Sequence, residues 1–204
     1  MVRRLVLICH GATAALRAAA FPADEPLEPG AEAAAARLAG ALPRFDAVRI
    51  APELRTRQTA AAAGLAGTLD ADLRDWDSGA WRGRSFAALQ AGDPEGLAAW
   101  RADPDAAPHG GESLTRLLGR AGGWLEGIAG AGERVVAVTH PALVRAVVTA
   151  ALGAPAEMFW RMDVTPLSHT EVRGGKGRWT LRIFGAPAAM PHGVANGEIE
   201  GEGD

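Results

Sequence analysis

The chain has 204 residues, a formal net charge of −3 and a mean hydropathy of +0.01. This length suits one domain with a sizeable core, and the charge lacks the basic excess typical of nucleic-acid-binding proteins. The single cysteine, Cys9, excludes an internal disulfide and a cysteine-rich metal site and fits a reducing compartment. The apolar stretch near the start is too short for a signal peptide or a membrane span, so we expect a cytoplasmic protein with no membrane partner.

Two apolar runs each end at a histidine. The run Leu5–Cys9 predicts a strand buried on both faces, as in a parallel sheet with helices on each side, and His10 and Gly11 follow it. Ligands gather at such strand ends, where Gly11 can adopt backbone angles that other residues avoid and lets a ligand approach the main chain closely. A second run, Val135–Thr139, ends in the same way at His140.

Helix and strand signals alternate along the rest of the chain, which predicts an α/β domain. Further strands are expected at 46–51, more weakly at 69–73, and in a terminal hairpin of 165–172 and 178–184. Helices are expected at 32–42, 52–65, 114–128 and 141–152, whereas 14–29, with three prolines, is expected to be a loop near the site. Residues 85–130 are interpreted as a helical insertion and 187–204 as a disordered tail.

Two histidines at neighbouring strand ends suit phosphoryl transfer through a phosphohistidine. A neutral imidazole is nucleophilic near neutral pH because its pKa lies close by. The transferring phosphoryl group carries spread negative charge, so it also needs arginines, backbone donors, a second imidazole and a proton donor for the leaving oxygen.

Five sequence blocks supply groups of these kinds. They are Cys-His-Gly-Ala-Thr at 9–13, Ala-Pro-Glu-Leu-Arg-Thr-Arg-Gln-Thr-Ala at 51–60, Leu-Arg-Asp-Trp-Asp-Ser-Gly-Ala-Trp-Arg-Gly at 73–83, Gly-Gly-Glu-Ser at 110–113 and Val-Thr-His at 138–140. In this order they resemble the motifs of the histidine phosphatase superfamily, which has the phosphoglycerate mutase-like fold. The resemblance implies a three-layer α/β/α sandwich with a mostly parallel central sheet over residues 1–186.

The resemblance also implies an activity. It indicates a metal-independent phosphomonoesterase that hydrolyses a small phosphorylated metabolite through a phosphohistidine on His10. Arg55 and His140 would bind the phosphate, and Asp75 would act as general acid and then as general base for water. Asp75 competes for that role with Asp77. A carboxyl beside a phosphate dianion is pushed towards its protonated form, because like charges disfavour ionisation.

Other residues near the motifs are candidates for substrate binding. They are Cys9, Gly11, Thr13, Arg17, Glu112 and Ala142. Ala142 enters because Pro141, at the first helical turn, would leave the amides of Ala142 and Leu143 free for the anion. Glu112 is equally compatible with a role in starting the helix at Ser113. His109 and His169 are interpreted as structural, and His192 lies in the expected tail.

Three positions depart from the family pattern. Cys9 stands where the family has a phosphate-binding arginine, Pro141 where a glycine is common, and Leu16 near a family asparagine. Loss of one charged partner of a buried anion costs roughly 2–5 kcal/mol, or about two to three decades or more in rate if the whole cost falls on the transition state. Three arginines are candidates to replace the missing guanidinium: Arg17, Arg82 and Arg145.

Several functions therefore stay open. Cys9 itself is not expected to be a nucleophile, because cysteine phosphatases need an arginine after five intervening residues and that position is Ala15. The alternatives to a phosphatase are a phosphoglycerate mutase, disfavoured because loop 14–29 offers only Arg17, and a weakly active or inactive phospho-ligand-binding protein, supported by Cys9. Compact length and the 85–111 insertion resemble the α-ribazole phosphatase branch. No cofactor or metal is expected, and a homodimer is left open.

Overall fold

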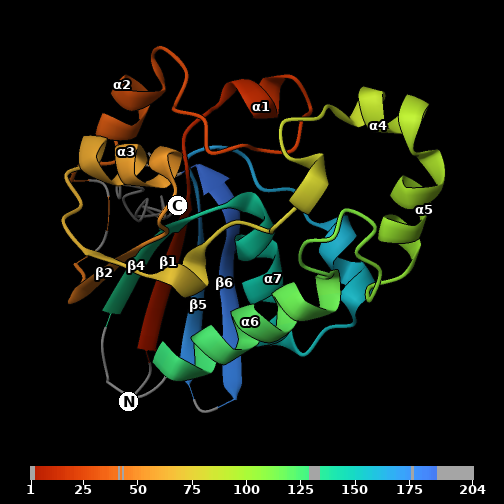
Figure 1. Ribbon diagram of the computed structural model, residues 1–204. Helices are drawn as coiled ribbons and strands as arrows, with labels where there is room; N and C mark the ends of the chain where they lie inside the picture. Colours follow the sequence, from red (N-terminus) through yellow and green to blue (C-terminus); the bar gives the residue numbers. More distant parts are fainter. Residues whose placement is uncertain (1–2, 41, 43, 129–133, 176, 188–204) are drawn as a thin grey trace, which may run out of the picture.

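A six-stranded sheet in the order β3-β2-β4-β1-β5-β6 forms the centre of the computed structural model, which describes residues 3–40, 42, 44–128, 134–175 and 177–187 (Figure 1). The strands are β1 Arg3–Cys9, β2 Ala47–Ile50, β3 Thr68–Leu69, β4 Arg134–Thr139, β5 Ser168–Gly175 and β6 Arg178–Pro187. The first four run parallel to one another, whereas β5 pairs antiparallel with both β1 and β6. The predicted mostly parallel sheet is confirmed.

Helices cover both faces of the sheet. The α-helices are α1 Ala14–Arg17, α2 Ala31–Ala36, α3 Leu54–Ala62, α4 Phe86–Gly92, α5 Pro94–Ala102, α6 Leu114–Gly127 and α7 Pro141–Leu152. Short 3-10 helices are η1 Ala71–Leu73, η2 Gly79–Trp81 and η4 Ala156–Arg161. Helices α2 and α3 cover one face of the sheet, and α6 and α7 cover the other. Helices α4 and α5 lie beside the sheet, at the right of the view in Figure 1. The predicted three-layer arrangement is confirmed.

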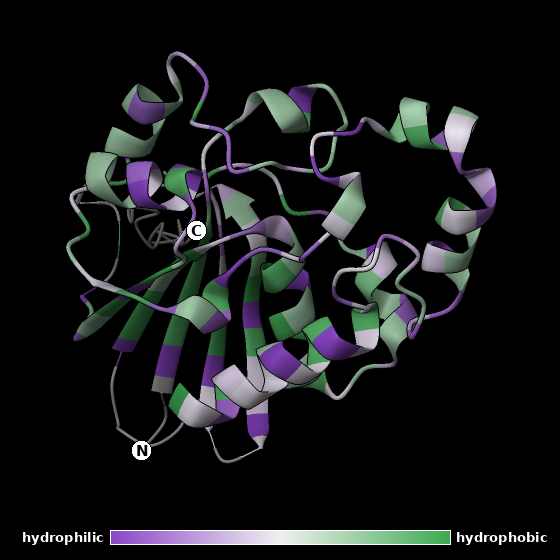
Figure 2. Ribbon diagram, in the orientation of Figure 1, coloured by the Kyte–Doolittle hydropathy of each residue, from purple (hydrophilic) through white to green (hydrophobic). Residues whose placement is uncertain are grey.

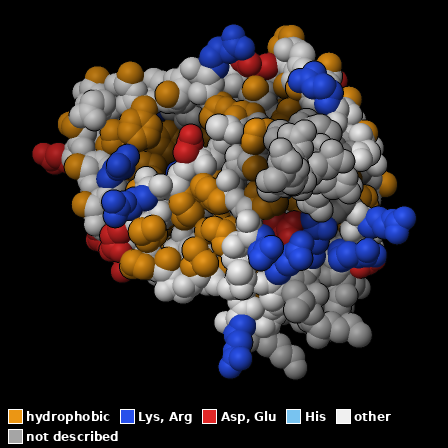
Figure 3. All heavy atoms as spheres, turned by 180° about the vertical axis from the view of Figure 1, so that it is seen from behind, with side chains coloured by type: hydrophobic (Ala, Val, Ile, Leu, Met, Phe, Trp, Pro, Cys, Tyr) orange, Lys and Arg blue, Asp and Glu red, His pale blue; other side chains and the backbone are white. Residues whose placement is uncertain are grey.

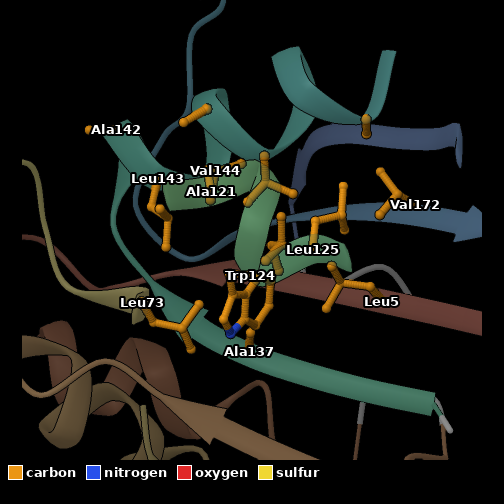
Figure 4. Packing of buried hydrophobic residues seen from close by; sticks show 14 of the residues in the cluster. Leu5, Leu73, Ala121, Trp124, Leu125, Ala137, Ala142, Leu143, Val144 and Val172 are labelled. Atoms are coloured by element: carbon orange, nitrogen blue, oxygen red, sulfur yellow. The ribbon is translucent and has the colours of Figure 1, made fainter. Parts of the chain in front are cut away.

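The apolar alternation along β1 divides the core between the two faces. Val6 and Ile8 pack in a cluster with apolar residues of α3. Leu5, Leu7 and Cys9 face the opposite way, into the larger cluster with α6 and α7 (Figure 4). Because successive side chains of a strand point to opposite faces, this strand needs apolar residues at every position, and the central strands are correspondingly hydrophobic (Figure 2). Burial of each such side chain stabilises the fold by about 1.5–3 kcal/mol.

The register of β1 and β4 brings the two histidine-bearing ends to the same level. Cys9 pairs with Thr139 across the parallel ladder, and the backbone N–H of His10 donates to the carbonyl of Thr139 at 2.9 Å. His10 and His140 therefore leave the sheet side by side, although 130 positions separate them in the sequence.

Several predicted boundaries are wrong. The strand expected at 69–73 has only two residues, because the Asp70 carboxylate accepts the N–H of Asp72 and starts η1 instead. The loop expected at 14–29 contains α1, capped by the Thr13 hydroxyl, which accepts the N–H of Leu16. The helix expected at 32–42 ends at Ala36, and the one expected at 52–65 spans Leu54–Ala62. The hairpin strands both extend further than predicted, to Gly175 and Pro187, and the rest of the expected tail lies outside the described residues.

The surface opposite to the view of Figure 1 has basic side chains in small groups, several of them beside acidic ones (Figure 3). Within the described residues, no helix combines the length and the apolar character that a membrane crossing requires.

Candidate active site

The rings of His10 and His140 meet edge to face, with centroids 5.2 Å apart. Nδ1 of His10 lies 2.7 Å from the carbonyl oxygen of Gly11. Since a carbonyl only accepts, the proton of a neutral His10 ring is on Nδ1, and Nε2 keeps a free electron pair. Burial, followed by the nearby His140, lowers the pKa of His10 to about 4. The ring is therefore neutral at pH 7 and can act as a nucleophile.

Gly11 does not use the backbone freedom of glycine. Its φ is not in the left-handed region, so unusual backbone angles do not explain the glycine. A Cβ at this position would lie 3.2 Å from Cδ2 of Leu27 and 3.4 Å from Cβ of Ala31. The glycine thus lets residues 27–31 pack closely against the end of β1. Its N–H donates to the Thr59 hydroxyl at 3.0 Å.

Arg55, in the first turn of α3, brings a buried positive charge to the two histidines. Its side chain is only 2% exposed, and Nη2 donates to Oδ2 of Asp75 at 2.7 Å. Nε and Nη1 have no hydrogen-bond partner in the described part of the chain, although Oδ1 of the exposed Asp24 lies 3.7 Å from Nη1. Leaving donors of a buried cation unpaired is destabilising by about 1–3 kcal/mol or more for each group. Such a guanidinium is suited to binding an anion through its two remaining N–H directions.

Asp75 lies between Arg55 and the second histidine. Its Oδ2 is 3.4 Å from Nδ1 of His140, and its Oδ1 accepts the N–H of Trp76 at 2.8 Å. Burial opposes ionisation of this carboxyl, but His140 and Arg55 outweigh it and lower the pKa of Asp75 to about 2. The competing candidate, Asp77, instead accepts from Gly79 N–H and from Arg82 and lies away from both histidines in the loop before η2.

Sequence reasoning missed Glu53. Its Oε2 lies 2.8 Å from Nε2 of His140, and its Oε1 accepts the backbone N–H of Asp75 at 3.0 Å. The glutamate stands in the second sequence block where the family pattern has leucine. A charged residue at an apolar motif position was the available signal, because such a carboxylate needs a partner when it is half buried.

A pocket of about 190 Å³ opens in front of His10 and Asp75. Besides these two residues, its polar lining includes Thr13 and Arg145. Its apolar lining includes Leu16, Phe21, Trp76, Trp100, Ala142 and Trp160. Two of the predicted substrate-binding residues, Thr13 and Ala142, therefore do line this pocket.

The other four predicted substrate-binding residues, Gly11 among them, do not line it. Arg17, on α1, is 78% exposed and forms an ion pair with Glu28. Cys9 is 1% exposed within the cluster between β1 and α7, where burial raises the pKa of its thiol. Glu112 binds Arg120 through both carboxylate oxygens, at 2.7 and 2.9 Å.

The Glu112–Arg120 pair supports the segment that carries Asp75. Arg120 donates to the carbonyl oxygens of Asp72 and Arg74, at 2.7 and 3.0 Å. The carbonyl of Glu112 accepts the indole N–H of Trp76 at 2.6 Å. Glu112 therefore faces the protein, and its contribution to the site is the placement of residues 72–76.

Of the three arginines that could replace the one missing at position 9, the structure brings Arg145 to the pocket. Its Nε donates to the carbonyl of Pro141 at 3.3 Å, so the side chain runs back towards the start of α7, and its guanidinium carbon lies 4.4 Å from the centre of the Phe159 ring. Burial lowers its pKa. It forms no ion pair with a carboxylate of the described residues, whereas Arg82 pairs with Asp77.

The remaining histidines have structural contacts. His109 Nδ1 accepts the N–H of Gly111, and its ring packs on Trp81. His169 Nδ1 lies 3.1 Å from the carbonyl of Ala186, and His192 lies outside the described residues. No group of three or more His, Cys, Asp or Glu side chains suited to a metal ion occurs in the described ranges.

Comparison with known proteins connects this geometry to a family. Glucosyl-3-phosphoglycerate phosphatase of Mycolicibacterium vanbaalenii is 29% identical over 224 residues, covering 95% of this chain and 99% of that protein. The bifunctional protein Rv2228c of Mycobacterium tuberculosis is 33% identical over 133 residues, covering 61% of this chain and 36% of that protein.

Solved structures agree with the fold. Mycobacterial glucosyl-3-phosphoglycerate phosphatase Rv2419c superposes with a TM-score of 0.79 at 26% identity, covering 91% of this chain and 100% of that one. The α-ribazole phosphatase of Shigella flexneri superposes with a TM-score of 0.80 at 24% identity, covering 95% of this chain and 100% of that one. This is a likeness of fold alone. The family model of the histidine phosphatase superfamily (branch 1) matches residues 5–186. The chain belongs to this superfamily and is a hydrolase of the histidine phosphatase type.

Proposed function

We propose that this protein hydrolyses a small phosphomonoester through a phosphohistidine formed on His10. The observation that carries the proposal is the position of a neutral imidazole, with its free Nε2, in one site with a buried guanidinium that has two unused donors. A nucleophile and an anion-binding cation are the two groups that phosphoryl transfer requires from the protein.

In the first step, Nε2 of His10 attacks phosphorus and forms an N–P bond. The bond from phosphorus to the ester oxygen breaks, its electron pair stays on that oxygen, and the departing alcohol takes a proton from Asp75. Arg55 stabilises the charge on the phosphoryl oxygens, as does the free amide of Ala142 at the start of α7. His140 does so in its imidazolium form, in which Nε2–H donates to Glu53 and Nδ1–H is left for the anion.

Asp75 needs a proton for this step, although its pKa is about 2 in the described arrangement. An incoming phosphoryl group competes for the same Arg55 and His140 and adds negative charge, both of which raise the pKa of Asp75. A substrate that enters as a monoanion supplies the proton itself. In the second step, the Asp75 carboxylate takes a proton from a water molecule whose oxygen forms a bond to phosphorus. The N–P bond breaks, its electron pair returns to Nε2 of His10, and inorganic phosphate leaves.

Arg145 supplies the guanidinium that the family pattern places at position 9. Arg145, on α7, lies near Cys9, because residues 5, 7 and 9 of β1 face α7. A partly buried arginine at the pocket, without an ion pair in the described residues, is suited to a phosphoryl oxygen. This assignment argues against the weakly active or inactive alternative.

The finer substrate stays a prediction. An α-ribazole phosphatase-like activity is supported only by chain length and fold, and the 29% identical relative points to a phosphorylated sugar acid. The mutase alternative requires 2,3-bisphosphoglycerate, so exchange between 2- and 3-phosphoglycerate in its presence separates the two functions.

Trapping of the phosphoenzyme tests the proposal. Brief incubation with ³²P-labelled 4-nitrophenyl phosphate, followed by alkaline denaturation, is expected to leave acid-labile label on the wild-type protein. His10→Ala should carry no label and show no turnover, whereas His169→Ala, a histidine on β5, should behave like wild type. Label or turnover that persists in a folded His10→Ala protein would contradict the assignment of the nucleophile.

A further inference from the structure

We infer that the alcohol part of the substrate is uncharged and apolar, with an aromatic ring as the best fit, and that the wall of Phe21, Trp76, Trp100 and Trp160 binds it. This inference rests on the proposed function and specifies its substrate class. It begins from the composition of the pocket, whose lining combines a few ionisable groups, His10 among them, with large apolar rings.

The four rings form one packed surface from four separate segments. The centroids of Trp76 and Trp100 are 5.0 Å apart, with their planes inclined by 31°. Trp160 meets Trp100 edge to face at 4.7 Å, and Phe21 meets it at 5.5 Å. Such contacts fix the rings against one another, so the wall is preformed and a ligand ring gains contact area without the entropic cost of ordering it.

Trp76 places this wall next to the reacting atoms. It directly follows Asp75, and its backbone N–H binds the carboxylate of that residue. Its indole N–H is held by the carbonyl of Glu112, so the orientation of the ring is fixed. The ester oxygen must lie beside Asp75 to receive its proton. The carbon attached to that oxygen therefore lies next to Trp76.

The charges of the pocket exclude an acidic or a cationic alcohol. Among its lining residues only His10, Asp75 and Arg145 are ionisable, and the proposed mechanism uses all three at the phosphoryl group. A substrate carboxylate would then find no unused cation among the lining residues, and Arg101, beside Trp160, is exposed to solvent, which screens its charge. A quaternary ammonium would find aromatic rings, but it would approach Arg145 and also Arg101, whose guanidinium carbon already lies 4.9 Å from the centre of the Trp160 ring.

Hydrolysis of primary phosphomonoesters tests the inference, because these share similar leaving groups. We expect kcat/KM for benzyl phosphate to exceed that for glycerol 3-phosphate, 3-phosphoglycerate and phosphocholine by about 10- to 100-fold, the gain from burying one ring. Equal values, or preference for 3-phosphoglycerate or phosphocholine, would overturn it.

A pair of leucine variants links this preference to the pocket. Leu16 lines the pocket and is 45% exposed, whereas Leu152, at the far end of α7, is 51% exposed. Both accept a lysine without a core defect. Leu16→Lys should shift the ratio of benzyl phosphate to 3-phosphoglycerate by about 10-fold towards the acidic ester, while Leu152→Lys should not change it. Equal behaviour of the two variants would contradict the assigned binding surface.

Phosphonates keep the substrate inference separate from the proposed chemistry. Neither benzylphosphonate nor 2-carboxyethylphosphonate is hydrolysed, so calorimetry measures binding alone. We expect the Kd of benzylphosphonate to be lower by about 10-fold or more. If benzylphosphonate binds more tightly but no monoester is hydrolysed, the catalytic proposal fails alone. If monoesters are hydrolysed but the order of the phosphonates is reversed, the substrate inference fails alone.

Discussion

Oε2 of Glu53 lies 2.8 Å from Nε2 of His140, while Oε1 of the same carboxylate accepts the backbone N–H of Asp75. One side chain thus orients both the second histidine and the proposed general acid. With its Nε2–H donated to Glu53, His140 presents Nδ1 to Asp75 and to the anion-binding side of the site. A positioning residue of this kind fixes the angle of the ring and leaves Nδ1–H of the imidazolium form for the anion.

Replacing Glu53 should therefore impair catalysis without unfolding the protein. We expect Glu53→Leu to lower kcat/KM by about 10- to 100-fold, by analogy with the carboxylates that orient metal-bound histidines. Glu53→Gln should lose less, because its amide oxygen still accepts one hydrogen bond. Steady-state kinetics over a range of pH checks this, with Glu32→Leu, at an exposed position of α2, as the control. A pH profile and rate equal to those of the control would show that Glu53 has no positioning role.

The sheet was predictable because its central strands are uniform. Leu5–Cys9 is apolar at every position and Val135–Thr139 at every position but the last, a pattern that a strand covered on both faces explains. The boundaries at the ends of elements were less predictable, because they depend on single hydrogen bonds. The carboxylate of Asp70 and the hydroxyl of Thr13 each start a short helix where sequence periodicity gave no signal.

The candidate site was predictable where strand ends determine it, and less so where a side chain can point two ways. His10 and His140 follow paired strands, so their approach follows from the fold. Arg17 and Glu112 stand close to motifs in the sequence, but α1 turns the first outward and Arg120 binds the second. Those directions depend on partners that are distant in the sequence, which spacing alone does not reveal.

Asp75→Asn should separate proton donation from anion binding. The amide keeps the size of the carboxyl but cannot protonate an alkoxide, so turnover of benzyl phosphate should fall by about 100- to 10,000-fold. The leaving group of 4-nitrophenyl phosphate is stable without a proton, so for this ester the rate of the first step should fall much less. Burst kinetics measures that step, and Asp77→Asn is the matched control. Equal losses for both esters would contradict general acid catalysis by Asp75.

Arg145→Ala should weaken catalysis far more than a surface arginine does. Loss of one partner of a buried anion costs roughly 2–5 kcal/mol, so we expect kcat/KM to fall by about 100-fold or more. Arg17→Ala should stay near the wild-type value. In the Arg145→Ala background, Cys9→Arg should raise kcat/KM again by at least about 10-fold, because the new guanidinium enters adjoining space. An Arg145→Ala enzyme with wild-type kinetics would exclude the replacement.

Cys9 should be chemically silent in the folded protein. It is buried against α7, and burial raises the pKa of its thiol, so no thiolate is present to react. We expect N-ethylmaleimide to leave phosphatase activity unchanged and one thiol to react only after unfolding in denaturant. Inactivation that follows the kinetics of labelling, and that disappears in Cys9→Ala, would place the thiol at the site.

The pH dependence of kcat/KM follows from two protonation requirements. The folded pKa of His10 is lowered to about 4, so the nucleophile is neutral above that pH, and activity should fall about tenfold per unit below it. Asp75 is already ionised above pH 4, so the proton for the alcohol enters with the monoanionic substrate. The second pKa of a phosphomonoester is about 6. Activity on benzyl phosphate should therefore be highest between about pH 4 and pH 6. A rate that keeps rising above pH 7 would show that Asp75 does not receive its proton from the substrate.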